Sequence, residues 1–256
     1  MPRDEVLAER PATARAVLAA CRSRWSWLAT HLDLPLQQAL DGIGDTMVVL
    51  RVPEGMSTAA ALDRIRALDA EGAYDFNHIY TGSAAEPGRA AAGGVAQAPE
   101  ARRAGHGAAQ AAKTRVGLVD SGVEARHAVF QDAAIQRWGC NDASHPGAHG
   151  TSVAAIMVGR SALFRGVAPE AQLYAADVYC DSASGGSADK IAGALAWLAK
   201  EQVAVINLSL VGPPNLTLER VVGAMVKRGH LVVAAVGNDG PAAPPIARVE
   251  RVADAA

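Results

Sequence analysis

Short apolar runs alternate with amphipathic segments from residue 114 onward. Four of the runs are rich in β-branched residues and predict strands, at 115–119, 172–179, 204–210 and 231–236. Apolar residues recur with helical spacing in three further segments, at 149–158, 187–200 and 216–228. Ser187 is a suitable N-cap for the second helix, and Gly229 a suitable end for the third. The alternation predicts an α/β domain over 113–256, with helices on both faces of a parallel sheet.

The pattern is weaker before residue 83. Alanine-rich residues 12–31 predict a helix, so residues 1–45 are expected to be a helical segment. Over 46–82 we expect a small α+β module, because an apolar run at 47–52 predicts a strand and Ser57 precedes a predicted helix at 58–68.

Residues 83–112 have a different composition. Thirteen of these thirty residues are alanine and five are glycine, which leaves little side-chain bulk to bury. This composition predicts a linker between the small module and the α/β domain.

Charge and hydropathy exclude two classes of partner. The chain has 24 Lys and Arg against 26 Asp and Glu, so no net positive field would attract nucleic acid or an acidic membrane. No run of about 18 apolar residues occurs, and the first 30 residues lack the features of a secretory signal. Cys140 and Cys180 either form a disulfide in an oxidising compartment or remain buried thiols.

Polar residues follow several of the predicted strands. Asp120 comes directly after the first strand, Asn207 and Ser209 end the third, and Asn238 follows the fourth. The carboxyl ends of parallel strands form one rim where ligands bind, and His149 at a helix start is expected at the same rim. Each residue alone is more often a turn former or a cap, but their joint placement favours a catalytic site. A histidine base, a carboxylate that orients it and an amide that stabilises an oxyanion would together serve acyl transfer.

A metal site is the alternative for some of the same residues. Its ligands would be drawn from a set of histidines and aspartates, namely Asp120, His127, Asp142, His145 and His149. Their spacing lacks the paired histidines of a helical zinc motif, so we expect no metal at this position.

Four segments resemble the motifs of the subtilisin-like serine peptidases, peptidase family S8, and they occur in the order of that family. The segments are 115–123, 149–154, 205–210 and 232–240. The resemblance implies that Asp120 orients His149 as general base, and that Asn238 is the oxyanion donor. It further implies a groove for a polypeptide substrate, lined by Asn207, Ser209 and Leu210.

The resemblance has consequences for the rest of the chain as well. It implies that residues 46–82 belong to a propeptide that packs on the catalytic domain, and that the protein is secreted or periplasmic. It implies no organic cofactor and allows structural calcium, for which the sequence shows no site. Two positions differ from the usual motifs, with Ser152 in place of a second histidine and Val211 in place of a glycine that follows the substrate strand.

The nucleophile is the main difference from the family. The expected Gly-Thr-Ser-x-Ala motif does not occur among the 18 residues after Asn238, and Ser152 lies on the same predicted helix as His149. We therefore expect a serine endopeptidase domain that is incomplete at its C-terminal side and inactive as these 256 residues. The alternative is a non-catalytic remnant that still binds peptides.

Overall fold

The computed structural model describes six segments of the chain. They are 16–21, 36–40, 46–52, 54–82, 114–182 and 185–235, the first two as backbone only. Asn238 and the linker predicted at 83–112 lie outside the described residues. Among the residues that are described, no helix has both the length and the apolar composition needed to cross a membrane.

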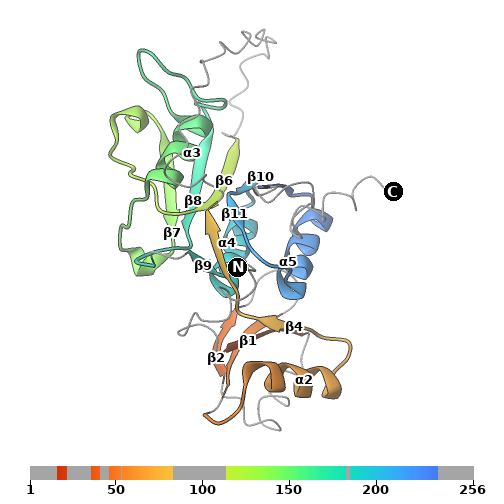
Figure 1. The fold of residues 1–256 in the computed structure, drawn as a ribbon. Helices are drawn as coiled ribbons and strands as arrows, with labels where there is room; N and C mark the ends of the chain where they lie inside the picture. The colour runs from red at the N-terminus through yellow and green to blue at the C-terminus, as the bar shows by residue number, and fades with distance from the viewer. Residues whose placement is uncertain are drawn as a thin grey trace, which may run out of the picture.

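The apolar runs after residue 113 form a parallel sheet of five strands (Figure 1). In spatial order the strands are β12 (Leu231–Ala234), β10 (Val205–Leu208), β6 (Arg115–Asp120), β8 (Gln172–Asp177) and β7 (Ala134–Trp138). The four predicted strands are confirmed. Strand β7 was not predicted, because it lies at the sheet edge, where its exposed Gln136 and Arg137 interrupt the apolar pattern.

Helices cover both faces of this sheet, as predicted. On one face α3 (Ala148–Val158) packs through Ala154 and Val158 in the cluster that contains Leu118. On the other face α4 (Ala188–Lys200) and α5 (Leu216–Lys227) share a larger cluster with Val119. Leu118 and Val119 belong to different clusters because successive side chains of a strand point to opposite faces. Two 3₁₀ turns, η2 (Ala128–Phe130) and η3 (Cys140–Asp142), complete this part of the chain.

The N-terminal part forms a second, antiparallel sheet with one helix. Its strands are, in spatial order, β2 (Leu36–Leu40), β3 (Thr46–Arg51), β1 (Ala16–Cys21) and β4 (Ala73–Phe76). Helix α2 (Thr58–Leu68) begins where the sequence predicts, and the hydroxyl of Ser57 accepts a hydrogen bond from Ala60 N at 3.1 Å. Leu62 and Ile65 of α2 are buried against Val48 and Leu50 of β3.

The helix predicted over 12–31 is wrong for Ala16–Cys21, which form β1. This strand is central in its sheet and pairs with β3 and β4. The preference of alanine for helices is worth only a few tenths of a kcal/mol per residue, so pairing on both sides outweighs it. The sheet also combines strands from both sides of residue 45, so it contains no boundary at that position.

A small third sheet joins the two parts of the chain. Strand β5 (Ile79–Gly82) lies between β11 (Leu210–Val211) and β9 (Gly186–Ser187) and is antiparallel to both. Two side chains near β4 also cap helices of the larger domain. Asp189 N donates to Asn77 Oδ1 at 3.1 Å, and Leu216 N donates to Asp75 Oδ2 at 2.9 Å. Accordingly, the N-terminal sheet lies below α4 and α5 in Figure 1.

Candidate active site

Two of the predicted site residues meet at the end of β6. Asp120 is the last residue of the strand and is fully buried, whereas the side chain of His149, on the first turn of α3, is 27% exposed. His149 Nδ1 lies 2.8 Å from both carboxylate oxygens of Asp120. A carboxylate only accepts hydrogen bonds, so Nδ1 carries the proton and Nε2 of the neutral ring has a free lone pair.

Hydrogen bonds of the residues that follow Asp120 and His149 keep these two side chains in contact. Asp120 Oδ1 accepts from Ser121 N at 2.6 Å, and the Ser121 hydroxyl accepts from Gly150 N at 3.0 Å. A side chain at Gly150 would not fit, because its Cβ would lie 2.1 Å from the carbonyl oxygen of Ser121. Thr151 Oγ1 accepts from Glu124 N at 3.0 Å. The residues that follow Asp120 and His149 therefore join the two turns directly.

The predicted groove residues lie on β10, which neighbours β6, and directly after it: Asn207 is in β10, Ser209 follows the strand, and Leu210 begins β11. Asn207 Nδ2 donates to Ser209 Oγ at 2.6 Å, and Ser209 N donates to Val119 O at 3.2 Å, just before Asp120. Leu210 is 1% exposed and pairs with Gly82 of β5. The structure thus brings Ser209 and Leu210 beside the end of β6. It does not place Asn238, which lies outside the described residues.

The hydroxyl of Ser152 makes its hydrogen bond within α3 and not to His149. Ser152 is exposed, and its hydroxyl donates to Ala148 O of the same helix at 2.8 Å. This local hydrogen bond is the usual one for a serine within a helix.

Asp120 and His149 are in contact, but no three residues of the alternative metal site bring their ligand atoms together among the described residues. Among the described residues, only Cys140, Asp177 and Cys180 bring three possible ligand atoms close together. Cys140 and Cys180 form a disulfide, so their sulfurs are not the thiolates that a metal requires. The sequence left open whether Cys140 and Cys180 form a disulfide or remain thiols, and in the structure they form the disulfide.

A residue that the sequence did not single out faces the same region. Burial, with a further contribution from the charge of Asp120, raises the pKa of Tyr179 to about 12. Its hydroxyl is buried and has no hydrogen-bond partner among the described residues. The nearest atom to a Cβ built on Gly82 would be this hydroxyl oxygen, at 3.2 Å. Tyr179 lies in the loop that follows β8, and its position near Asp120 depends on the path of this loop. No short sequence motif therefore predicts its role.

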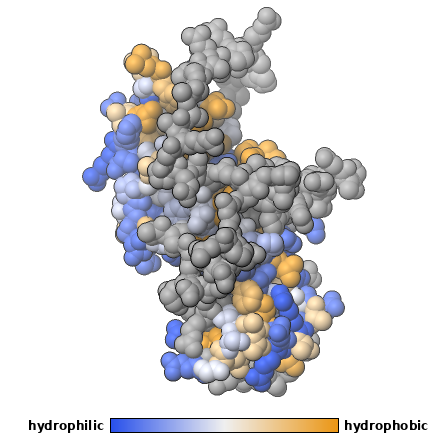
Figure 2. Space-filling view, in the orientation of Figure 1, coloured by the Kyte–Doolittle hydropathy of each residue, from blue (hydrophilic) through white to orange (hydrophobic). Residues whose placement is uncertain are grey.

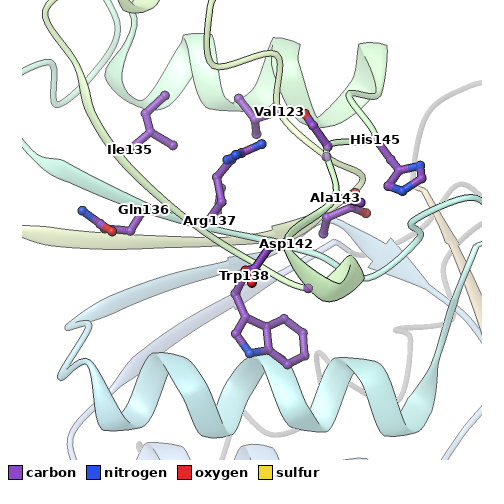
Figure 3. Close-up of a pocket in the computed structure, with 13 residues that line it drawn as sticks. Val123, Ile135, Gln136, Arg137, Trp138, Asp142, Ala143 and His145 are labelled. Atoms are coloured by element: carbon purple, nitrogen blue, oxygen red, sulfur yellow. The ribbon is translucent and has the colours of Figure 1, made fainter.

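A cavity of about 260 Å³ adjoins the pair without containing it. Its lining includes Gly122 and His145, which belong to the turns that carry Asp120 and His149. Figure 3 shows the indole of Trp138 pointing toward the helix below it and the ring of His145 turned away from Arg137. The predicted catalytic and groove residues are not part of this lining.

The chain is similar in sequence to known subtilisins. Subtilisin Savinase from Lederbergia lenta is 46% identical over 95 residues, which cover 36% of this chain and 35% of that protein. Subtilisin E from Bacillus subtilis (strain 168) is 36% identical over 132 residues, or 49% of this chain and 34% of that protein. The chain thus spans about a third of the length of these two relatives.

A solved structure supports the fold. Fervidolysin from Fervidobacterium pennivorans, described as a keratinolytic enzyme related to subtilisin, matches with a TM-score of 0.63 at 17% identity. The match covers 90% of this chain and 41% of that one. In addition, residues 111–255 match the model of the subtilase family, Peptidase_S8. The chain therefore belongs to the subtilase family of serine peptidases.

Proposed function

We propose that this chain carries the base and the groove of a serine endopeptidase site. The observation that carries the proposal is the 2.8 Å contact between His149 Nδ1 and the buried carboxylate of Asp120. Asp120 fixes the tautomer of the ring and stabilises the imidazolium that forms during the reaction. His149 is then the general base and Asp120 the residue that orients it.

The chemistry follows from this assignment. Nε2 of His149 takes the proton of a serine hydroxyl, and the serine oxygen forms a bond with the carbonyl carbon of the peptide. The amide of Asn238 donates a hydrogen bond to the oxygen that becomes negative. His149 then returns the proton to the leaving amine as the peptide bond breaks. The family's serine motif does not follow Asn238 within these 256 residues, so the chain by itself should hydrolyse nothing.

We also propose that residues 46–82, called the N-terminal module below, belong to a propeptide that occupies the groove. The pairing of β5 with β9 and β11 supports this role, because it fills the position that an extended substrate would take. The caps that Asp75 and Asn77 provide to α5 and α4 support it as well, since they fix the module on the catalytic domain. The module would thereby block access to His149.

A serine-directed fluorophosphonate tests the first part of the proposal. The 256-residue chain and its Ser152→Ala variant should both remain unlabelled, and labelling at Ser152 would overturn the assignment. The nucleotide sequence beyond codon 256, read in three frames, then shows whether a Gly-Thr-Ser-x-Ala segment follows. An extended chain with that segment should react with the probe and cleave protein.

A matched variant tests the role of His149. In the extended chain His149→Ala should lower kcat by about 10⁶-fold, a magnitude that comes from a subtilisin and is not an independent estimate. Ser152→Ala is the control, because it lies three residues further along the same exposed helix start. Equal activity of the two variants would contradict a catalytic role for His149.

Peptide binding without catalysis is the second candidate function. The same β5 pairing favours it, since the groove holds an extended segment in a chain without the serine motif. The test is binding of an extended peptide by a variant of the 256-residue chain in which Tyr80→Ala and Thr81→Pro weaken β5, the strand that occupies the groove. Ser209→Pro should weaken it, because proline has no N–H to donate to Val119 O, and this hydrogen bond holds the chain before β11 beside the end of β6.

A further inference from the structure

We propose that Cys140, Asp177 and Cys180 form a zinc site once the disulfide between the two cysteines is reduced. The loops that the disulfide joins would then stay joined, by a metal ion, under reducing conditions. These loops are η3, which precedes α3, and the loop that follows β8. The proposal does not depend on the proposed function, because none of the three residues takes part in the proposed catalysis.

The three side chains lie close enough to share one metal ion. Their possible ligand atoms, two sulfurs and one carboxylate oxygen, are all within 4.8 Å of one another. Zinc binds thiolate sulfur at about 2.3 Å with tetrahedral angles, which places two such sulfurs about 3.8 Å apart. The Cα atoms of Cys140 and Cys180 are 5.3 Å apart, so rotation of the two side chains can bring the separated sulfurs to that distance.

One carboxylate oxygen of Asp177 is free to bind a cation. Oδ1 accepts hydrogen bonds from Tyr179 N at 3.0 Å and from Cys180 N at 2.9 Å, which fix the orientation of the carboxylate. Oδ2 is buried and has no hydrogen-bond partner among the described residues. A buried carboxylate oxygen without a partner costs free energy, and a bound metal ion would remove that cost.

Two glycines make room around this carboxylate. A Cβ at Gly139 would lie 2.3 Å from the main-chain oxygen of Asp177, so glycine lets the chain before Cys140 come this close. A Cβ at Gly122 would lie 2.7 Å from Asp177 Oδ2, so this glycine leaves space in front of the unpartnered oxygen. Gly122 and Asp177 both line the cavity shown in Figure 3, from which water would fill the fourth position of the zinc ion.

The backbone of η3 is strained and is held by its surroundings. Cys140, Asn141 and Asp142 have φ of 57°, 51° and 64°, and Cys180 has φ 55°. This left-handed region is unfavourable for residues other than glycine and persists only where neighbouring structure enforces it. Once the disulfide is broken, a zinc ion between the two loops would hold the turn in the same conformation.

The ligand set selects the metal. Thiolates are soft ligands that favour zinc, whereas calcium and magnesium prefer oxygen. A dithiol such as dithiothreitol opens the site by reducing the disulfide. Its two thiols become a disulfide, and their two electrons and two protons pass to the sulfurs of Cys140 and Cys180. Zinc then displaces both protons to solvent, because the thiolate and not the thiol is the ligand.

The experiment measures the zinc affinity of the full chain in its two redox states. Cys21→Ser is the background, so that Cys140 and Cys180 supply the only thiols. The chain is reduced with dithiothreitol, freed of it by gel filtration without oxygen, and titrated with zinc against a coloured chelator. The reduced chain should take zinc from the chelator, and the oxidised chain should not. Equal binding by the two states would place the zinc elsewhere and overturn the proposal.

Matched variants assign the carboxylate ligand. Asp177→Asn keeps the shape of the side chain and removes its charge. It should weaken zinc binding by at least about tenfold, since even indirect partners of a metal contribute that much. Asp181→Asn is the control, because it removes the same charge from an exposed residue next to Cys180. Equal affinities of the two variants would overturn the role of Asp177, and zinc binding that survives Cys140→Ser would overturn the site.

A second measurement covers a reduced chain that does not fold without metal. Zinc is then added as the reductant is removed, and the melting temperature is compared with and without it. Zinc should raise the melting temperature of the reduced chain toward that of the oxidised chain, because it binds the folded state, and it should do so less in the Asp177→Asn variant. A reduced chain that zinc does not stabilise overturns the proposal, because the metal would not replace the cross-link.

Discussion

At the scale of single residues, the contact between Asp120 and His149 depends on the absence of one side chain. Gly150 lets the start of α3 approach the chain after β6, where its N–H reaches the Ser121 hydroxyl at 3.0 Å. Any Cβ here would collide with backbone, which cannot rotate away as a side chain can. The glycine of the histidine motif is thus a requirement of packing.

Gly150→Ala is therefore expected to destabilise the protein by about 3 kcal/mol, at the upper end of the usual cost of overpacking. The free energy of unfolding in urea measures the effect. Ser152→Ala, two positions further along, should change it by less than about 0.5 kcal/mol because Ser152 is exposed. Equal values for the two variants would mean that α3 shifts to accept the methyl group.

A second residue makes the stability depend on pH. Burial lowers the pKa of His78 below 6.5, although the negative charge of Asp75, 3.8 Å away, opposes the shift. The unfolded chain then binds more protons than the folded one just below pH 6.5, so protonation favours unfolding. The stabilisation is complete above pH 6.5 and is lost as the pH falls through the lowered pKa.

We expect the unfolding midpoint of the protein to fall between pH 7.5 and pH 5.5 by more than that of His78→Gln. The difference between the two proteins isolates the contribution of His78 from that of other groups. Parallel pH profiles would show that His78 does not titrate differently in the folded state.

Sequence reasoning identified Asp120 and His149 because short motifs carry them, and the structure brings the two together. Tyr179, Asp75 and Asn77 were missed for a different reason. Each acts on a segment far along the chain, as Asn77 does on Asp189, 112 positions away. A pattern within one segment holds no information about such a partner.

At the scale of elements, the N-terminal module provides caps for two helices of the other domain. Ser187 lies at the predicted N-cap of α4, but it makes no side-chain cap bond, and Asn77 supplies the acceptor for Asp189 N. At α5 the caps are shared, since Asn215 accepts from Leu218 N and Asp75 accepts from Leu216 N. The carboxylate of Asp75 also interacts favourably with the positive end of the helix dipole.

Asp75→Ala is expected to lower the free energy of unfolding by about 1 kcal/mol, the usual cost of a lost cap. Asp63→Ala on the exposed face of α2 is the matched control, since it removes the same charge away from the domain contact. Similar values for the two variants would show that Asp75 contributes only through net charge.

Elements differed in how well their sequence predicted them. Helix α2 has the predicted bounds, because its cap and its buried stripe agree. The sequence predicts a helix where β1 forms, since its alanines suit both states and only the neighbouring strands β3 and β4 decide between them. The four residues of β5 are too few for a periodicity, so its pairing with the groove was not expected.

At the scale of the whole molecule, one covalent bond joins loops that follow two strands. The disulfide between Cys140 and Cys180 links η3, after β7, to the loop after β8 and spans 40 positions. A cross-link of this length reduces the entropy of the unfolded chain and should stabilise the fold by about 4 kcal/mol. Dithiothreitol should lower the melting temperature of the protein and leave that of a Cys140→Ser, Cys180→Ser variant unchanged.

The edge of the large sheet leaves apolar side chains in solvent. Leu231 and Val233 of β12 are 57% and 42% exposed, whereas Val232 between them is 5% exposed and packs toward α4 and α5. The exposed pair lies beside Val205 and Asn207 of β10, on the face of the sheet on which α3 contacts β6 and β8. An apolar strip at a sheet edge favours association between molecules.

The same substitution, valine to threonine, at the adjacent positions Val232 and Val233 of β12 tests whether the strip is exposed to solvent. Val232→Thr should cost about 1–3 kcal/mol in unfolding free energy, because it buries a hydroxyl without a partner. Val233→Thr should cost less than about 0.5 kcal/mol, since the side chain is already in solvent. It should also lower the binding of a hydrophobic dye and slow aggregation, which light scattering measures. Equal costs at the two positions would mean that this face is covered in solution.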